Sequence, residues 1–134
     1  MIKYVIRAKK NPIAKSAKYY PQIAPTTPVT LAQIVKRIEK RSTVSSADMK
    51  AVLDALQYEV IEALQNGNSV RLGDLGSFHL SIKANGSATS DEARRTGANT
   101  IKAVNVQFTK STAMRDALSP SGVEFGLQED ISND

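Results

Sequence analysis

Residues 67–80 read Gly-Asn-Ser-Val-Arg-Leu-Gly-Asp-Leu-Gly-Ser-Phe-His-Leu, and this stretch decides the fold class. It contains two short runs with strand character, joined by a turn with glycines at both ends, residues 73–76. Apolar residues alternate with polar ones as far as residue 83, as in a sheet with one face on helices and one face in solvent. The stretch therefore predicts an antiparallel sheet that packs on helices.

Two amphipathic helices are expected before this sheet. The first begins at Thr30, where the sequence Thr-Leu-Ala-Gln fits a capping box, and apolar residues follow at helical spacing. The second begins with Ser45 or Ser46 as its N-cap and ends at Asn66-Gly67, because glycine tolerates the left-handed conformation that closes a helix. Together they predict a helical hairpin whose apolar faces the sheet can cover.

A charged segment, residues 83–100, follows the first part of the sheet and is expected to be flexible. A further alternating strand then ends at Phe108. The apolar residues of this strand change parity, so a bulge is expected near Ala103. Residues 111–118 are expected to form a short final helix.

The order and spacing of these parts resemble the HU/IHF family of bacterial histone-like DNA-binding proteins over residues 29–118. The most specific motif is residues 70–78, and the second is residues 106–118, which resemble the junction between the third strand and the final helix of that family. The resemblance implies an α+β, HU/IHF-like fold. A helical hairpin would pack on a three-stranded antiparallel sheet with a β-arm and a short C-terminal helix, as an intertwined homodimer.

The chain is expected to divide into three parts. Residues 1–29 form an N-terminal extension, interpreted as a β-hairpin followed by a proline-containing linker. Residues 30–118 form the HU-like DNA-binding domain, and residues 119–134 form an acidic tail that is expected to be largely flexible. The extension resembles that of a divergent HU-like branch with a short β element before its helices.

Charge is unevenly distributed along the chain, whose formal net charge is +5. Residues 1–20 hold six cations and no acidic residue, whereas residues 119–134 hold four acidic residues and no cation. Without that tail, 18 cations stand against 9 acidic residues, which gives +9 for residues 1–118. A basic body with an acidic tail suits a polyanionic partner.

The resemblance implies that the partner is double-stranded DNA, bound largely without regard to sequence. Basic residues of the arm and sheet are the expected DNA contacts: Arg71, Lys83, Arg94, Arg95, Lys102 and Lys110. The family's arm carries an Arg-Asn-Pro tip whose proline wedges between base pairs, but residues 83–100 contain no proline, so intercalation is not expected. Two alternatives stay open: a solvated loop with incidental charges, and contacts from the basic helix cluster Lys36, Arg37 and Lys40 or from the N-terminal lysines.

The resemblance also implies a shared core between two copies of the chain. A helical hairpin and one small sheet leave apolar surface that a second copy can bury. The residues predicted to form this dimer core are Leu56, Val60, Leu75, Phe78 and Phe108.

Other classes of function find little support. His79 is the only histidine, it lies on the polar face of a predicted strand, and no cysteine or acidic cluster accompanies it as a metal ligand. We therefore expect no enzyme activity, metal, cofactor or small-molecule substrate. With no apolar run near the ~20 residues of a membrane span and no signal-peptide pattern, we expect a cytoplasmic location and no membrane association. The resemblance to HU implies a location at the nucleoid. The alternative function is an HU-like scaffold adapted to protein–protein interaction.

Overall fold

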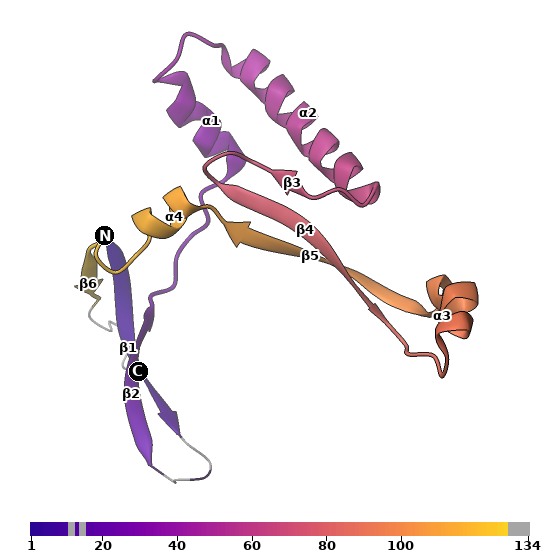
Figure 1. Ribbon diagram of the computed structural model, residues 1–134. Coiled ribbons are helices and arrows are strands. Elements are labelled where there is room, and N and C mark those ends of the chain that lie inside the picture. Colours follow the sequence, from indigo (N-terminus) through magenta and orange to yellow (C-terminus); the bar gives the residue numbers. More distant parts are fainter. Residues whose placement is uncertain (11–12, 14–15, 129–134) are drawn as a thin grey trace. The chain divides into compact units, whose positions relative to one another are not determined.

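The computed structural model describes residues 1–10, 13 and 16–128 and divides the chain into two compact units (Figure 1). One unit combines residues 1–30 with residues 116–134, and the other comprises residues 31–115. In the division predicted from the sequence, the C-terminal tail is a separate part. The difference arises because the two ends of the chain meet in one sheet, which local sequence patterns do not reveal.

The unit of residues 31–115 begins with the predicted helical hairpin. Helix α1 spans Leu31–Glu39 and helix α2 spans Ser46–Gln65. The Ser45 hydroxyl caps α2 by accepting a hydrogen bond from the backbone N–H of Asp48, at 3.2 Å. Just after α2, Gly67 adopts the left-handed conformation, with φ of 83°. No helix among the described residues has both the length and the apolar character that crossing a membrane requires.

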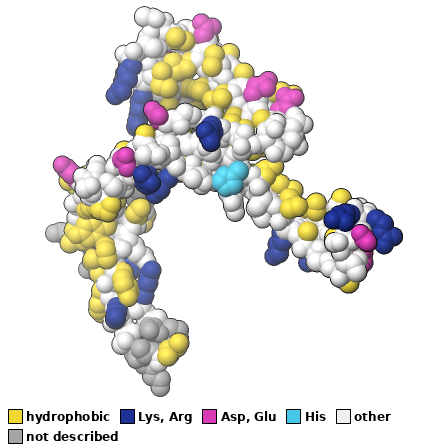
Figure 2. All heavy atoms as spheres, viewed as in Figure 1, with side chains coloured by type: hydrophobic (Ala, Val, Ile, Leu, Met, Phe, Trp, Pro, Cys, Tyr) yellow, Lys and Arg dark blue, Asp and Glu magenta, His cyan; other side chains and the backbone are white. Residues whose placement is uncertain are grey.

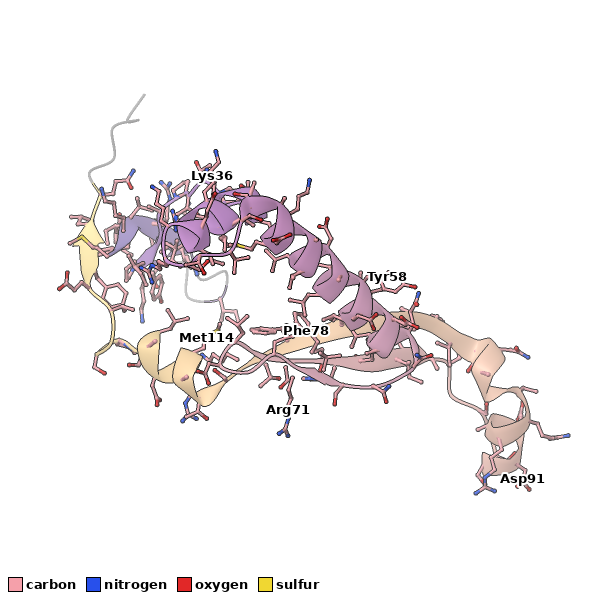
Figure 3. All side chains as sticks on the ribbon, turned by 90° about the horizontal axis from the view of Figure 1, so that it is seen from above. Lys36, Tyr58, Arg71, Phe78, Asp91 and Met114 are labelled. Atoms are coloured by element: carbon pink, nitrogen blue, oxygen red, sulfur yellow. The ribbon has the colours of Figure 1, made fainter. Side chains whose placement is uncertain are left out.

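A three-stranded antiparallel sheet follows the helices, as predicted. It consists of β3 (Val70–Arg71), β4 (Gly76–Ala84) and β5 (Ile101–Lys110), with β4 in the centre. Phe78 and Phe108 pair across β4 and β5, and their ring centroids lie 5.2 Å apart. Figure 3 shows Phe78 on the side of the sheet nearer to α2, whereas Arg71 points away from it. The alternation read from the sequence thus gives the correct faces.

The predicted irregularity in the last strand is also present. Lys83 pairs with Ala103, but the next residue, Ala84, pairs with Ile101. Lys102 is therefore an extra residue on β5, which is the definition of a β-bulge. The bulge lies one residue from the predicted position.

The prediction of a flexible segment over residues 83–100 is wrong. Helix α3 (Ser90–Thr96) and a 3-10 turn, η1 (Gly97–Thr100), stand at the end of the β4–β5 ribbon (Figure 1). The Thr89 hydroxyl caps α3 by accepting a hydrogen bond from the backbone N–H of Glu92, at 3.2 Å. Thr89 and Glu92 have the spacing of a capping box, which is the sequence signal for this helix.

The second unit contains a small mixed sheet with the strand order β2-β1-β6. Strands β1 (Ile2–Lys10) and β2 (Ala17–Ile23) form an antiparallel hairpin, and β6 (Phe125–Leu127) runs parallel to β1. Pro21 fits in β2 because this strand lies at the sheet edge. Helix α4 (Thr112–Ala117) precedes β6 in the chain.

Residues 125–127 of the segment that is predicted to be a flexible tail form strand β6. The backbone N–H of Ile2 donates to the carbonyl of Glu124 at 2.7 Å, and the N–H of Gln128 donates to the carbonyl of Tyr4 at 2.9 Å. These bonds hold residues 124–128 against β1. The other acidic residues of the tail, Glu129, Asp130 and Asp134, lie outside the described residues.

Ending the chain after Ser119 is therefore expected to destabilise the N-terminal sheet. The truncation removes β6 and its backbone hydrogen bonds to β1, each of which contributes about 1 kcal/mol. Hydrogen exchange should show faster exchange of the amide of Ile2. A chain that ends after Gln128 keeps β6 and is the matched control, which should exchange as the full chain does. Equal protection of Ile2 in both truncated chains would contradict the assigned role of β6.

Few side chains are buried within a single chain. Among the described residues, the buried hydrophobic side chains are Val5, Ala24, Val35 and Met49. The apolar residues of α2 and of the β4–β5 ribbon are mostly exposed or half-buried. Hydrophobic burial is the main force that stabilises folded domains, so these apolar faces lack the cover that a stable domain needs.

Candidate nucleic-acid interface

The six basic residues predicted to contact DNA are all exposed, but they do not form one cluster. Two lie on the polar face of the sheet, one lies at the bulge, one lies on the apolar side of β5, and two lie on α3. In the order of the chain these are Arg71, Lys83, Arg94, Arg95, Lys102 and Lys110.

The polar face of the sheet carries Arg71 and Lys83 at its two ends. Arg71 pairs with Ser77, which lies six positions before Lys83 on β4, or about 20 Å along the strand. Between them, His79 lies with its Nε2 atom 3.1 Å from Oε1 of Gln107 on β5. This hydrogen bond explains the histidine as part of a polar sheet surface. In the described part of the chain, no three His, Asp or Glu side chains gather as metal ligands.

The two basic residues of β5 differ in their surroundings. Lys102 is the extra residue of the bulge, where the ladder of hydrogen bonds is interrupted. Lys110 pairs with Gly76, so it shares a side of the sheet with Phe108. The register thus separates Lys110 from the polar face that carries Arg71.

The tip of the arm combines opposite charges. Asp91 and Glu92 lie in the first turn of α3, and Arg94 and Arg95 lie in its last turn, as the helix dipole favours. Nη1 of Arg94 lies 3.4 Å from Oδ1 of Asp91, and these side chains are 78% and 85% exposed. Figure 2 shows both charge types together at this tip. The four charges sum to zero, so the tip is not strongly basic.

The ion pair at the tip is weak. Exposed pairs of this kind contribute about 0–1 kcal/mol, so a phosphate can compete with Asp91 for the guanidinium of Arg94. Arg95 makes no ion pair within the residues that the structure describes. Both arginines are predicted as DNA contacts, but the helix that holds them, which follows the Thr89 cap, is not predicted.

The predicted dimer core is not formed within one chain. Leu56, Leu75 and Phe108 are 44%, 57% and 48% exposed, respectively. Val60 and Phe78 are half-buried. None of the five residues is enclosed by the atoms of its own chain, although Phe78 and Phe108 contact each other.

Sequence comparison places the chain among HU-type proteins. Residues 1–124 match a family described as an HU domain fused to a wHTH, Ig or glycine-rich motif. The chain is also similar to the DNA-binding protein HU of Thermus thermophilus, with 38% identity over 52 residues. This match covers 39% of the chain and 54% of the Thermus protein, so the chain spans about half the length of that relative.

Two solved structures have similar folds. A protein from Bacteroides vulgatus ATCC 8482, proposed to be a bacterial DNA-binding protein, superposes with a TM-score of 0.68 at 19% identity, over 94% of this chain and 47% of that chain. Anabaena HU, in a cocrystal with DNA, superposes with a TM-score of 0.52 at 21% identity, over 69% of this chain and 99% of that chain. At these identities the likeness shows a shared fold. The resemblance to HU that residues 70–78 and 106–118 indicate is thereby confirmed.

Proposed function

Because the chain belongs to the family of HU domains fused to a wHTH, Ig or glycine-rich motif, we propose that it binds duplex DNA as an architectural protein. The family match over residues 1–124 is the observation that carries this proposal. HU-family proteins are not enzymes, and the function of this chain is binding. The names of the Thermus and Anabaena relatives, which state DNA binding for those proteins, support the same class of partner.

In the proposed complex, exposed cations contact phosphates and the protein reads little sequence. Each cation that neutralises a phosphate releases a condensed counterion, which favours binding at low salt. The exposed positions of Arg71, Lys83 and Lys102 and of the two arginines on α3 support this mode. Residues 83–100 offer no proline as a wedge, so binding proceeds without proline intercalation.

The DNA-binding unit is proposed to be a homodimer. The exposed apolar faces of α2 and of the β4–β5 ribbon support this assembly, because a second copy can bury both. Monomeric proteins rarely leave apolar patches of more than a few hundred Å² uncovered. In the dimer, Leu56, Val60, Leu75, Phe78 and Phe108 form the shared core.

Titration of random-sequence duplex DNA at several salt concentrations tests the proposed function. Fluorescence anisotropy should show binding that weakens steeply as salt increases, with a linear plot of log K against log salt. A second duplex of unrelated sequence should give a similar affinity. Absence of binding at about 50 mM salt would contradict DNA binding and favour a scaffold adapted to protein interaction.

The double variant Arg94→Ala/Arg95→Ala tests the arm. A dimer presents four such cations, and each phosphate contact contributes about 0.9 to the slope, so the slope should flatten by at most about 3.6. The variant Asp91→Asn is the control, and its expected effect on DNA affinity is opposite, because it removes a negative charge that repels phosphate. It should strengthen binding at low salt. An unchanged slope in the arginine variant would place the contacts on Lys36, Arg37 and Lys40 or on the N-terminal lysines.

The alternative function, protein interaction, is favoured by one feature of the N-terminal sheet. A hollow of about 540 Å³ lies on its apolar face, lined by Ile2, Tyr4, Ile6, Pro21, Gln22, Ile23 and Phe125. Exposed apolar surface of this kind is typical of protein–protein interaction sites. A folded protein that does not bind DNA even at low salt would favour this alternative.

A further inference from the structure

Most cations of the β1–β2 hairpin lie on the face opposite to its main apolar face. Residues that pair across the two strands share a face. Tyr4 pairs with Ile23 and Ile6 with Pro21, whereas Arg7 pairs with Tyr20 and Lys9 with Lys18. One face therefore carries Tyr4, Ile6, Pro21 and Ile23, with Lys10 at its end. The other face carries the buried Val5 and four exposed cations, and we call it the cationic face: Lys3, Arg7, Lys9 and Lys18. Figure 2 shows hydrophobic side chains gathered over one side of this hairpin, with basic side chains along its edge.

The strands that carry the cationic face contain no acidic residue. Residues 1–20 contain six cations and no acidic residue, and β6 contributes only Phe125, Gly126 and Leu127 to the sheet. Among the described residues, the acidic residue that adjoins β6 is Glu124, which lies beside Ile2 at the end of β1 opposite to Lys9. This contrasts with the arm tip, where Asp91 and Glu92 cancel the charges of the two arginines.

Two lysines of this face lie directly opposite each other. Lys9 and Lys18 are cross-strand partners, and like charges in such positions destabilise a hairpin. Both side chains are exposed, and neither makes an ion pair within the described residues. Nζ of Lys9 lies 5.6 Å from the centre of the Tyr20 ring, which holds the ammonium over the strand. A bound anion would remove the repulsion between the two ammonium groups.

We propose that the cationic face is a second phosphate-binding surface, which contacts the backbone of duplex DNA apart from the HU arm. This inference rests on the proposed function, because it assigns a further contact to the same ligand. Arg7 and Lys9 project from the same face about 6.6 Å apart, with Lys18 about 5 Å across from Lys9. Such a compact group of cations suits a closely spaced row of phosphates.

The division of the faces argues against a membrane surface as the partner. Peripheral membrane elements bury an apolar face beneath the lipid headgroups and place their cations on its borders. In this hairpin Arg7, Lys9 and Lys18 stand on the face opposite to Tyr4 and Ile6, so the apolar residues and Lys9 cannot enter the same interface together. Phosphates of DNA require only the cationic face.

The double variant Lys9→Gln/Lys18→Gln tests this surface by its effect on the salt dependence of binding to random-sequence duplex. Loss of two phosphate contacts per chain should flatten the slope of log K against log salt by about 1.8 for one chain and about 3.6 for a dimer. The matched control is Arg41→Gln/Lys50→Gln, which removes the same charge from exposed positions near the helical hairpin. The control should flatten the slope by less than half as much.

Each outcome of this experiment decides the proposal. If Lys9→Gln/Lys18→Gln binds with the slope of the wild type, or with the same slope as the control variant, the cationic face does not contact phosphates. The proposed function would then remain intact. A wild type that does not bind duplex would overturn both. The variant Lys9→Arg/Lys18→Arg keeps the charge and should restore the wild-type slope if phosphates are contacted. Binding of the cationic face to polyglutamate but not to duplex would assign it to an acidic protein and overturn the proposal.

Discussion

Replacing Phe108 by alanine is expected to lower the free energy of unfolding by about 3–5 kcal/mol and to shift the proposed dimer toward monomers. Within one chain the Phe108 ring contacts Phe78 but is 48% exposed. A half-exposed aromatic ring cannot account for such a loss, whereas a ring enclosed by a second copy can. The size of the effect therefore reports on the dimer core.

Light scattering and urea denaturation of both proteins would measure this effect. In a dimer that is coupled to folding, the denaturation midpoint rises with protein concentration. Tyr19→Ala is the matched control, because Tyr19 is 72% exposed and lies on the N-terminal hairpin. It should change stability by less than about 1 kcal/mol. A wild type that is monomeric at micromolar concentration and unfolds cooperatively would contradict the dimer.

Much of the unit of residues 31–115 could be predicted from the sequence because its signals are local. Helical spacing of apolar residues, the Ser45 cap and Gly67 locate the α2 helix within one residue of its observed start. Alternation in the strands gives the two faces of the sheet, and the change of parity gives the bulge at Lys102. Each of these features depends on the spacing of a few neighbouring residues.

The features that the sequence analysis missed are of two kinds. Helix α3 is short and polar on all sides, so it has no apolar stripe. Its sequence signal is the capping-box spacing of Thr89 and Glu92. Strand β6 has only three residues and pairs in parallel with the opposite end of the chain. Pairing between distant segments depends on tertiary packing, to which strand propensity is a weak guide.

The candidate interface shows the same limit. The sequence identifies every basic residue but does not show which of them meet a neutralising partner. Arg94 and Asp91 are three residues apart, and they become neighbours only because α3 is a helix. The Lys9 and Lys18 pair, in contrast, depends on the register of the β1–β2 hairpin. A count of cations does not show their neighbours, whereas the structure sets acidic residues beside the arginines of the arm and a second lysine beside Lys9.

Gly76→Ala is expected to destabilise the sheet by about 3 kcal/mol or more, because the site has neither the conformation nor the space for a side chain. Gly76 is buried and has a φ of 153°, which L-residues rarely adopt. An added Cβ would collide with the backbone carbonyl oxygen of Thr109 and lie 2.7 Å from Cζ of Phe108. The backbone of β5 cannot move without breaking its pairing with β4.

Gly86→Ala is the matched control for this substitution, since a Cβ at Gly86 would meet no atom within 4 Å. It should leave stability within about 0.5 kcal/mol of the wild type or raise it slightly, because alanine restricts the unfolded chain. Urea denaturation would measure both variants. A Gly76→Ala protein as stable as the wild type would mean that β4 and β5 do not approach each other closely at Phe108. The same approach brings Phe78 and Phe108 into contact, so that result would also remove the basis for the dimer core.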